Sequence, residues 1–368
     1  MDLSKLNIRT SPRARATSPE EIFRTLTLRG TVENIFGPQV EALRVWDGRR
    51  GERDTIIGMA TGGGKTLVGL LIAKSLVNET RGKVLYVCPN NQLVEQTAER
   101  AAECGIDVAT YYGGRWTGRE SYDEATGPCI TNYAAVFNGF SIFRAQDITA
   151  LVFDDAHVAS HEIRKSFTLR IEPEHGAFRA IADLFRPYLS RSSRAHHLER
   201  ALAGDWRALL FVPMFEIAHA HEQVRRLLID GGVERDSNRY AWNHLNGRLS
   251  RCVVLISGGG IEITPPVLPV DSLPYFEAGV RRAYLTATMP SQIEFIRTFG
   301  VADVEPIVPS GKLGTAQRQI QFLVGDGDET QRENAKRLVE GVKAAIITPS
   351  VTDAEEWCPP ARRFDSRE

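Results

Sequence analysis

The sequence predicts an α/β protein whose core is a doubly wound, mainly parallel β-sheet. A glycine-rich loop, residues 59–66, separates an apolar run that ends at Ile57 from a helix-like apolar run that begins at Leu67. Further apolar runs alternate with helical patterns, as expected for parallel strands that are buried on both faces. Polar turns end these runs, and in such sheets ligands bind at the carboxyl ends of the strands. The further predicted strands are residues 83–88, 107–114 with a turn, 128–133 and 150–153.

The glycine-rich loop, Met59-Ala60-Thr61-Gly62-Gly63-Gly64-Lys65-Thr66, is typical of a phosphate-binding loop. Its three glycines let the backbone wrap around an anion, and the next helix points free N–H groups at the same place. We expect Thr61 and the glycines to bind phosphates, Lys65 to reach the β- and γ-phosphates, and Thr66 to hold Mg²⁺. The full pattern starts with Gly, whereas this loop starts with Met59. The alternative is a glycine turn ahead of a core helix, but we interpret the loop as an ATP or GTP site.

The composition is that of an ordinary globular protein. The chain has 368 residues, 25% charged and 42% hydrophobic, with a formal net charge of -1, which neither indicates nor excludes nucleic-acid binding. The apolar stretches are shorter than the roughly 20 residues of a membrane helix, and the N-terminus lacks a secretory signal. The five cysteines lie far apart, so we expect reduced thiols in a cytoplasmic protein, with no zinc site and no iron–sulfur cluster.

The N-terminal region is predicted to contain a loose arm and two helices. Residues 1–17 are polar and basic without periodicity, and Ser18-Pro19-Glu20-Glu21 is typical of a helix start. A second amphipathic helix follows Gln39. The amide of Gln39 could bind the edge of an adenine through one donor and one acceptor, while the alternative is a solvated helix cap.

An acidic pair supplies the second half of the predicted nucleotide site. The apolar run at 150–153 leads directly into Asp154 and Asp155. Asp154 is the expected Mg²⁺ ligand, and Asp155 is suited to orienting and deprotonating the attacking water. Two adjacent acids can also form a simple turn, but their combination with the upstream loop favours the site.

In this order the motifs resemble those of superfamily 2 helicases of the DEAD/DEAH type. The glycine-rich loop resembles motif I, including the Met-first form of RecQ-like members, and Asp154-Asp155-Ala156-His157 resembles motif II with Asp where the family has Glu. Thr286-Ala287-Thr288 resembles motif III. The resemblance covers about residues 35–160 and 275–350. It implies a RecA-like fold, ATP and Mg²⁺ as cofactors, and DNA or RNA as the partner, tracked as a single strand.

The resemblance also implies residues for strand binding and for coupling. His157 is expected to hydrogen-bond motif III, at Thr286 and Thr288, and so to link nucleotide state to nucleic-acid binding. The residues expected to contact the nucleic acid are Pro89, Asn90, Asn91, Gln92, Gly113, Gly114, Thr131 and Asn132.

A mainly helical insertion is predicted at 161–249, between motifs II and III. It is similar to the arch of XPD/DinG-like helicases, which carry a four-cysteine cluster that this sequence lacks. Its arginines give it a basic tilt, for which a solvated helix face is the alternative. The glycines at 258–260 indicate a hairpin turn. His157 and His161, and His219 and His221, lack further ligands at metal-binding spacing.

The predicted first RecA-like lobe is formed by residues 18–160 and 250–305, followed by a linker at 306–327. Residues 328–368 are similar to the start of a second RecA-like lobe. That lobe's arginines, which stabilise the transferring phosphoryl group, have no counterpart here, so we expect a fragment or a truncated protein. A partner or a second copy would then supply the arginine. The sequence thus predicts an ATP-dependent helicase or translocase core. The alternative is a nucleotide-gated binding module with little hydrolysis, while a kinase or GTPase is disfavoured.

Overall fold

The computed structural model describes residues 15–29, 34–192, 194–289 and 291–310, together with positions 333 and 337. The four ranges fall in one compact unit, residues 1–311. Residues 1–14 of the predicted arm lie outside the described residues. Apart from positions 333 and 337, so do the predicted linker beyond residue 310 and the predicted start of a second lobe.

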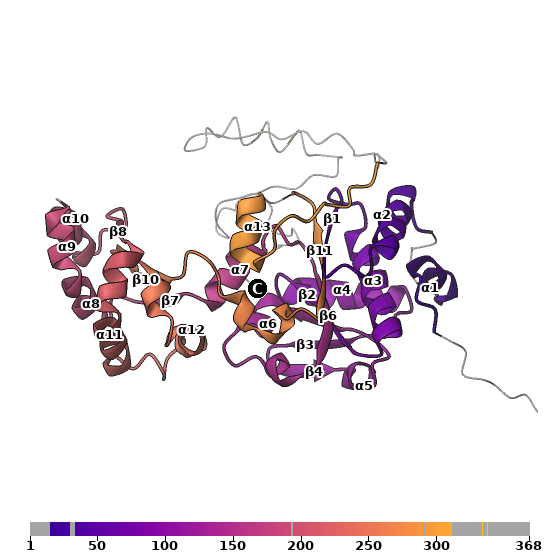
Figure 1. The fold of residues 1–368 in the computed structure, drawn as a ribbon, viewed down its shortest axis with the longest axis horizontal. Coiled ribbons are helices and arrows are strands. Elements are labelled where there is room, and N and C mark those ends of the chain that lie inside the picture. The colour runs from indigo at the N-terminus through magenta and orange to yellow at the C-terminus, as the bar shows by residue number, and fades with distance from the viewer. Residues whose placement is uncertain are drawn as a thin grey trace, which may run out of the picture. The chain divides into compact units, whose positions relative to one another are not determined.

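The central sheet has seven strands in the order β1-β11-β6-β2-β5-β3-β4 (Figure 1). Every neighbouring pair is parallel except β3 and β4, so the predicted doubly wound parallel sheet is confirmed. The middle strands are apolar on both faces because helices cover both faces. The strands are β1 (Asp54–Gly58), β2 (Lys83–Cys88), β3 (Ala109–Tyr112), β4 (Arg115–Thr117), β5 (Cys129–Asn132), β6 (Ile148–Phe153) and β11 (Arg281–Thr286).

Two hydrophobic clusters lie on the two faces of this sheet. One contains apolar residues of α1, α2, α3 and α4, and the other contains residues of α6, α7 and α13. Helix α3 contains the apolar run 67–73 and is buried along most of its length, which fixes the segment that directly follows the glycine-rich loop. The helices are α1 (Pro19–Thr25), α2 (Gly37–Gly48), α3 (Lys65–Thr80), α4 (Asn91–Glu103), α5 (Arg119–Asp123), α6 (Tyr133–Phe137), α7 (Ala159–Ser166) and α13 (Gln292–Phe299).

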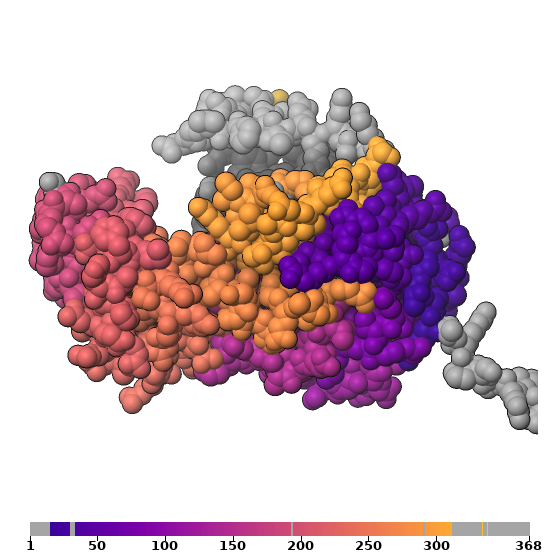
Figure 2. Space-filling view, in the orientation of Figure 1, coloured from indigo at the N-terminus to yellow at the C-terminus, as the bar shows by residue number. Residues whose placement is uncertain are grey.

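Two segments that the sequence predicts as loose are attached to this lobe. The carbonyl of Ala16 accepts a hydrogen bond of 2.7 Å from Asn78 in α3, although residues 15–17 are predicted as arm. At the other end, Ile307 is buried, its carbonyl accepts from Gly58 N at 2.9 Å, and it pairs with Ile57 beside β1. Figure 2 shows the surface of residues near 305–310 adjoining that of α2, in agreement with the hydrogen bonds between Ser310 and Glu41. The described parts of both segments therefore pack on the lobe.

The insertion contains a second, antiparallel sheet in the order β7-β10-β9-β8, with its own hydrophobic cluster. The range 161–249 is mainly helical, as predicted, since only β7 and β8 fall within it. The assignment of residues 250–264 to the first lobe is wrong, because β9 and β10 pair with β8 and β7. The elements of the insertion are β7 (Leu169–Ile171), α8 (Phe178–Leu184), α9 (Arg186–Arg191), α10 (Ala195–Leu202), β8 (Leu210–Val212), α11 (Met214–Asp230), α12 (Arg239–Leu245), β9 (Val253–Ser257) and β10 (Gly260–Thr264).

The predicted turn at the glycines of 258–260 is confirmed, because β9 and β10 form a hairpin that pairs Ser257 with Gly260. Alternate residues of the two strands, such as Ile256 and Ile261, are buried in the cluster of the insertion. This alternation requires a hydrophobic partner on one face, which the helices α8–α11 supply. Short 3-10 helices complete the described elements at Ile142–Ala145, Leu249–Arg251, Val270–Ser272 and Pro274–Phe276.

His244 of α12 joins the insertion to the first lobe. Its Nε2 lies 2.8 Å from the carbonyl oxygen of Phe137, and its ring stacks on Phe167 with centroids 4.3 Å apart. Burial lowers the pKa of His244 to about 4. The imidazole is therefore neutral near pH 7, and this neutral ring packs in the joint. Within the described residues, no helix is both long and apolar enough to span a membrane.

Candidate functional site

The glycine-rich loop connects the end of β1 to the start of α3. Gly62 and Gly64 have φ values of 82° and 76°, in the left-handed region that costs other residues about 1–2 kcal/mol. A Cβ on Gly64 would also lie 2.0 Å from Nε2 of Gln39. Within the loop, Gly63 N donates to the carbonyl of Ala60 at 2.9 Å. Glycine is thus required at position 64 for two reasons, backbone conformation and close approach.

Gln39 supports this loop instead of presenting a free amide. Its Oε1 accepts from Phe36 N at 2.8 Å and so caps α2, while its Nε2 donates to the carbonyl of Gly63 at 3.2 Å. The side chain is buried. The sequence around Gln39 is compatible with an adenine contact and with a solvated helix cap. The hydrogen bonds here are those of a cap, and both ends of the amide are already used.

The acidic pair lies at the carboxyl end of β6, opposite the loop. Lys65 Nζ is 3.2 Å from Asp155 Oδ1, so the two motifs are in direct contact. Asp155 adopts a φ of 46°, unusual for a residue with a side chain. The Asp154 carboxylate is buried and accepts from Asp155 N at 3.0 Å. Burial, together with the Asp155 charge, raises the pKa of Asp154 to about 6, while Lys65 opposes the rise.

These residues fit a magnesium ion. A buried carboxylate with a raised pKa is poorly stabilised as an anion, and a cation would correct this. The carboxylate of Asp154 and the hydroxyl of Thr66 are hard oxygen donors of the kind that Mg²⁺ prefers. No group of three His, Cys, Asp or Glu side chains suited to a metal occurs among the described residues. Mg²⁺ commonly takes one or two protein ligands and completes its shell with water and phosphate.

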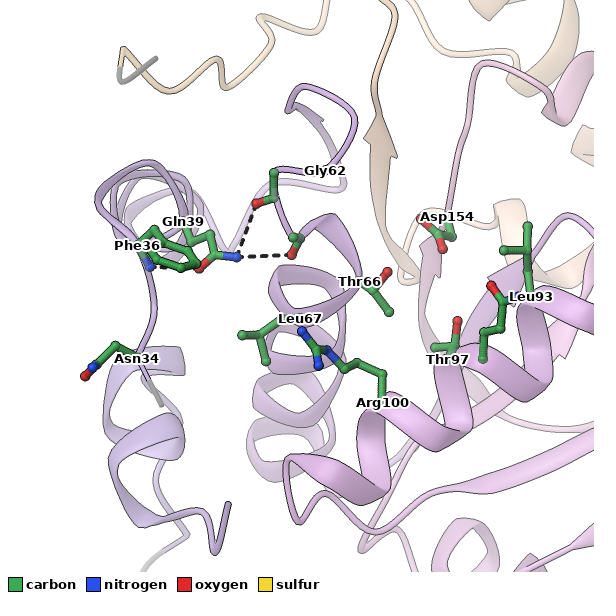
Figure 3. A pocket seen from close by; sticks show the side chains of 13 residues that line it. Asn34, Phe36, Gln39, Gly62, Thr66, Leu67, Leu93, Thr97, Arg100 and Asp154 are labelled. Atoms are coloured by element: carbon green, nitrogen blue, oxygen red, sulfur yellow. Dashed lines mark hydrogen bonds between the residues drawn. The ribbon is translucent and has the colours of Figure 1, made fainter. Parts of the chain in front are cut away.

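A cavity of about 530 Å³ opens between the loop and α4 (Figure 3). In Figure 3 the hydroxyl of Thr66 points to the side on which Asp154 lies. Thr61, Lys65 and Asp155 flank the cavity without lining it. Several lining residues were missed by the sequence analysis, although those of α4 recur at spacings of three and four, which mark one helix face. The lining residues are Asn34, Phe36, Gln39, Gly62, Gly63, Gly64, Thr66, Leu67, Leu93, Gln96, Thr97, Arg100 and Asp154.

The residues predicted to contact nucleic acid lie at or just after the carboxyl ends of three adjacent strands, β2, β5 and β3. We call residues 89–92, 113–114 and 131–132 the β2–β5–β3 edge, and residues 59–66 and 154–157 the β1–β6 edge. Because the strands are parallel, both sets of residues lie at the same end of one sheet. The topology thus brings the predicted strand-contacting residues together, beside the nucleotide cavity.

Four polar side chains of the β2–β5–β3 edge, those of Asn90, Asn91, Thr131 and Asn132, already have protein partners. Asn90 caps α4 by accepting from Leu93 N at 2.9 Å. Asn132 caps α6 by accepting from Ala135 N at 2.7 Å, and it donates to Asn91 Oδ1 at 2.6 Å.

Further along the same edge, the hydroxyl of Thr131 donates to the carbonyl of Tyr111 at 2.6 Å. Gly113 and Gly114 have positive φ values and form the turn between β3 and β4. The sequence pattern of this edge is therefore explained at least partly by local structure.

The predicted coupling through His157 takes a different form. Among the described residues no hydrogen bond joins His157 to Thr286 or Thr288. The buried Nδ1 of His157 makes no hydrogen bond there and lies 3.9 Å from Asp155 Oδ1. The main chain makes the connection instead. The carbonyl of Thr286 accepts from Met59 N at 2.9 Å, and that of Leu285 accepts from Ala156 N at 2.8 Å. The end of β11 thus contacts both the loop and the acidic motif.

Comparison with known proteins agrees with this geometry. Residues 33–190 match the family described as "Type III restriction enzyme, res subunit". The match includes the glycine-rich loop and the acidic pair, and it confirms the predicted likeness to superfamily 2 helicases. Over residues 33–190 this chain is therefore similar to that family, and its central sheet has the predicted RecA-like architecture.

Solved structures with a similar fold include three helicases. XPD in its apo form is 14% identical, with 73% of this chain and 56% of that chain covered and a TM-score of 0.44. The MrfA helicase is 13% identical, with 94% and 40% covered and a TM-score of 0.43. UvsW of bacteriophage T4 is 19% identical, with 40% and 53% covered and a TM-score of 0.31. The chain thus spans 56% of the XPD chain that it matches.

Proposed function

We propose that this chain is the ATP-binding motor core of a nucleic-acid helicase or translocase. The observation that carries the proposal is the apposition of the two nucleotide motifs. Lys65 lies 3.2 Å from Asp155, and the glycines, Thr66 and Asp154 share one cavity of about 530 Å³. A volume of this size lies in the range of small-molecule sites, about 300–1,000 Å³.

In this proposal, the triphosphate binds across the N-terminus of α3. Thr61 and the glycines hold the phosphate oxygens, and Thr66 with Asp154 hold Mg²⁺, which neutralises charge on the β- and γ-phosphates when bound. Lys65 exchanges its contact with Asp155 for the γ-phosphate. That exchange releases the Asp155 carboxylate, which then orients the attacking water and accepts its proton.

The nucleic acid binds at the β2–β5–β3 edge. Backbone N–H groups at the start of α4 and in the glycine turn at 113–114 are suited to phosphate oxygens, which positions a strand without reading its sequence. A single strand of DNA or RNA is the expected partner. Coupling runs from β11, whose main chain contacts both nucleotide motifs. His157, Thr286 and Thr288 are positioned to take part in it.

A nucleotide-gated binding module is the second candidate, and Asp155 favours it. Aspartate is one methylene shorter than glutamate, and in this structure its carboxylate contacts Lys65. Such a module would bind ATP and a strand but turn ATP over slowly. In either case a partner or a second copy would supply the arginine that completes the site. The buried free cysteines at 88, 104, 129 and 252 suit a cytoplasmic location.

The test is ATP turnover by this chain beside a Lys65→Ala variant, with single-stranded DNA, with RNA and without either. Turnover that a strand stimulates and Lys65→Ala abolishes supports the motor core. Lys65-dependent binding without turnover on any strand supports the second candidate. Binding that is unchanged in Lys65→Ala contradicts both.

A further inference from the structure

One wall of the nucleotide cavity has no role in the function proposed above. This wall is the inner face of α4, where Leu93, Gln96, Thr97 and Arg100 line the cavity. Their spacing places them on one side of the helix over two turns. Among the described lining residues, Arg100 is the sole lysine or arginine. Arg100 therefore places a permanent positive charge in the cavity that is proposed to bind the nucleotide phosphates.

The position of Arg100 indicates which part of the nucleotide it faces. In Figure 3 its side chain leaves α4 and points toward Leu67, a residue of the first turn of α3 that also lines the cavity. In the same view, Thr66 lies between the end of the Arg100 side chain and Asp154. Thr66 and Asp154 would hold Mg²⁺ near the β- and γ-phosphates, so the γ end of the triphosphate would lie on their side of the cavity. The guanidinium of Arg100, which points toward Leu67, then faces the opposite end of the phosphate chain, where the α-phosphate lies.

The present partner of Arg100 is weak enough to be replaced. Its Nη1 donates to Glu103 Oε2 at 2.6 Å, one turn along the helix. The two side chains are 37% and 45% exposed, and ion pairs this exposed contribute little to stability because solvent screens them. A phosphate offers the guanidinium two oxygens in a geometry that matches its fork. Exchange of Glu103 for phosphate therefore costs little.

We propose that Arg100 binds the α-phosphate of the nucleotide. This inference rests on the proposed function, since it requires a nucleotide in the cavity. It makes α4 a shared element of two sites, because the same helix begins at the loop 89–92 of the β2–β5–β3 edge. A nucleotide that pulls on Arg100 acts on a rigid helix whose other end contacts the strand. The two ligands are then coupled, and the coupling is reciprocal.

The first test compares Arg100→Gln with Glu103→Gln in the full chain. Both variants break the same ion pair, but only the first removes the cation. Calorimetric titration with ATP and with ADP, both with Mg²⁺, is expected to show about tenfold weaker binding in Arg100→Gln. The factor is the same for both nucleotides, since both carry an α-phosphate. Glu103→Gln binds as tightly as the parent chain or more tightly.

Arg186→Gln serves as a matched control. Arg186 pairs with Asp183, three residues before it, and also with Glu199. It is 39% exposed, close to the 37% of Arg100, but it lies in the insertion and does not line the cavity. Its affinity for ATP and ADP is expected to equal that of the parent chain.

The outcomes separate this inference from the proposed function. Equal losses of nucleotide affinity in Arg100→Gln and Glu103→Gln mean that the ion pair affects binding only by stabilising the fold. This result overturns the inference. Unchanged affinity in Arg100→Gln, with binding abolished in Lys65→Ala, also overturns it and leaves the proposed function standing. Unchanged affinity in Lys65→Ala overturns both.

A second measurement tests the coupling at saturating ATP, where weaker nucleotide binding is compensated. The probe is a fluorescent oligo-dT, titrated with and without ATP. The quantity compared is the ratio of the oligonucleotide affinities with and without ATP. This ratio is expected to differ from one in the parent chain and to move toward one in Arg100→Gln. An unchanged ratio contradicts the role of α4 as the shared element.

Discussion

The two edges of the central sheet differ in how well their polar groups are satisfied. At the β1–β6 edge, the buried carboxylate of Asp154 has a pKa raised to about 6, and Asp155 has a φ of 46°. At the β2–β5–β3 edge, Asn90 and Asn132 cap helices, and the hydroxyl of Thr131 donates to a carbonyl. Strain and poorly stabilised charge persist where a ligand can relieve them. The contrast teaches that the first edge leaves a charge and a strained backbone uncompensated, as the proposed nucleotide site would require, whereas the described polar residues of the second edge stabilise the fold.

The largest expected effect comes from Asp154→Asn. The change removes the charge of the proposed Mg²⁺ ligand, so ATP turnover should fall at least about 100-fold. The free energy of unfolding without nucleotide and Mg²⁺ should not fall, because a buried charge is replaced by a neutral side chain of similar shape. Turnover assays and urea denaturation measure the two quantities. A clear loss of stability would show that the carboxylate serves the fold, against the contrast drawn above.

A buried titratable group that is satisfied provides a comparison for Asp154. The pKa of His244 is lowered to about 4, against an ordinary value near 6.5. The unfolded chain therefore takes up the proton first as the pH falls. Stability should be full above about pH 6.5 and decline toward pH 4, by about 3 kcal/mol at most. Urea denaturation between pH 7 and 4 measures this loss.

The control for His244 is His244→Gln, which retains a side chain able to donate to the carbonyl of Phe137 but does not titrate. The decline between pH 6.5 and 4 should be smaller in this variant by the same amount. An identical pH profile in the two proteins would mean that other groups cause the acid sensitivity.

At the β2–β5–β3 edge, Asn132→Ala should lower the free energy of unfolding by about 1–2 kcal/mol, because α6 loses its cap and Asn91 loses its partner. The affinity for ATP should remain unchanged, since Asn132 does not line the cavity. Thermal unfolding and ATP titration together give the answer. Unchanged stability with weakened strand binding would instead mark Asn132 as a ligand of the nucleic acid alone.

The smallest expected effect is that of Thr131→Val, which keeps the shape of the side chain and removes its hydroxyl. The buried hydrogen bond to the Tyr111 carbonyl is lost, at a cost of about 1 kcal/mol. Urea denaturation resolves a change of this size. Were the stability unchanged while oligonucleotide binding weakened, the hydroxyl would belong to the strand site and the contrast between the edges would fail there.

Much of the fold could be predicted because its signals are local. Apolar runs that end in polar turns identify the central strands, and the spacing of glycines before Lys65 identifies the loop. The assignment of β9 and β10 failed because strand pairing is a long-range property. Their alternating pattern shows that one face of each strand is buried, but it does not show which sheet the two strands join.

The candidate site was only partly predictable, for the same reason. The motifs at 59–66 and 154–155 indicate a nucleotide site from residues close in sequence. The residues of α4 that line the cavity show only the three- and four-residue spacing of one helix face. This spacing is equally typical of a helix packed in a core, so it does not predict a site. Gln39 shows the limit most clearly, because the acceptor of its amide, the carbonyl of Gly63, lies 24 residues away.

Calorimetric titration of the full chain with ATP and Mg²⁺, beside Lys65→Ala, tests the central claim most directly. The account predicts saturable binding at one site by the parent chain and at least about 100-fold weaker binding by the variant, since Lys65 is the main cation of the phosphate loop. Equal binding by both proteins, or no binding by the parent chain, would contradict the assignment of the β1–β6 edge as a nucleotide site.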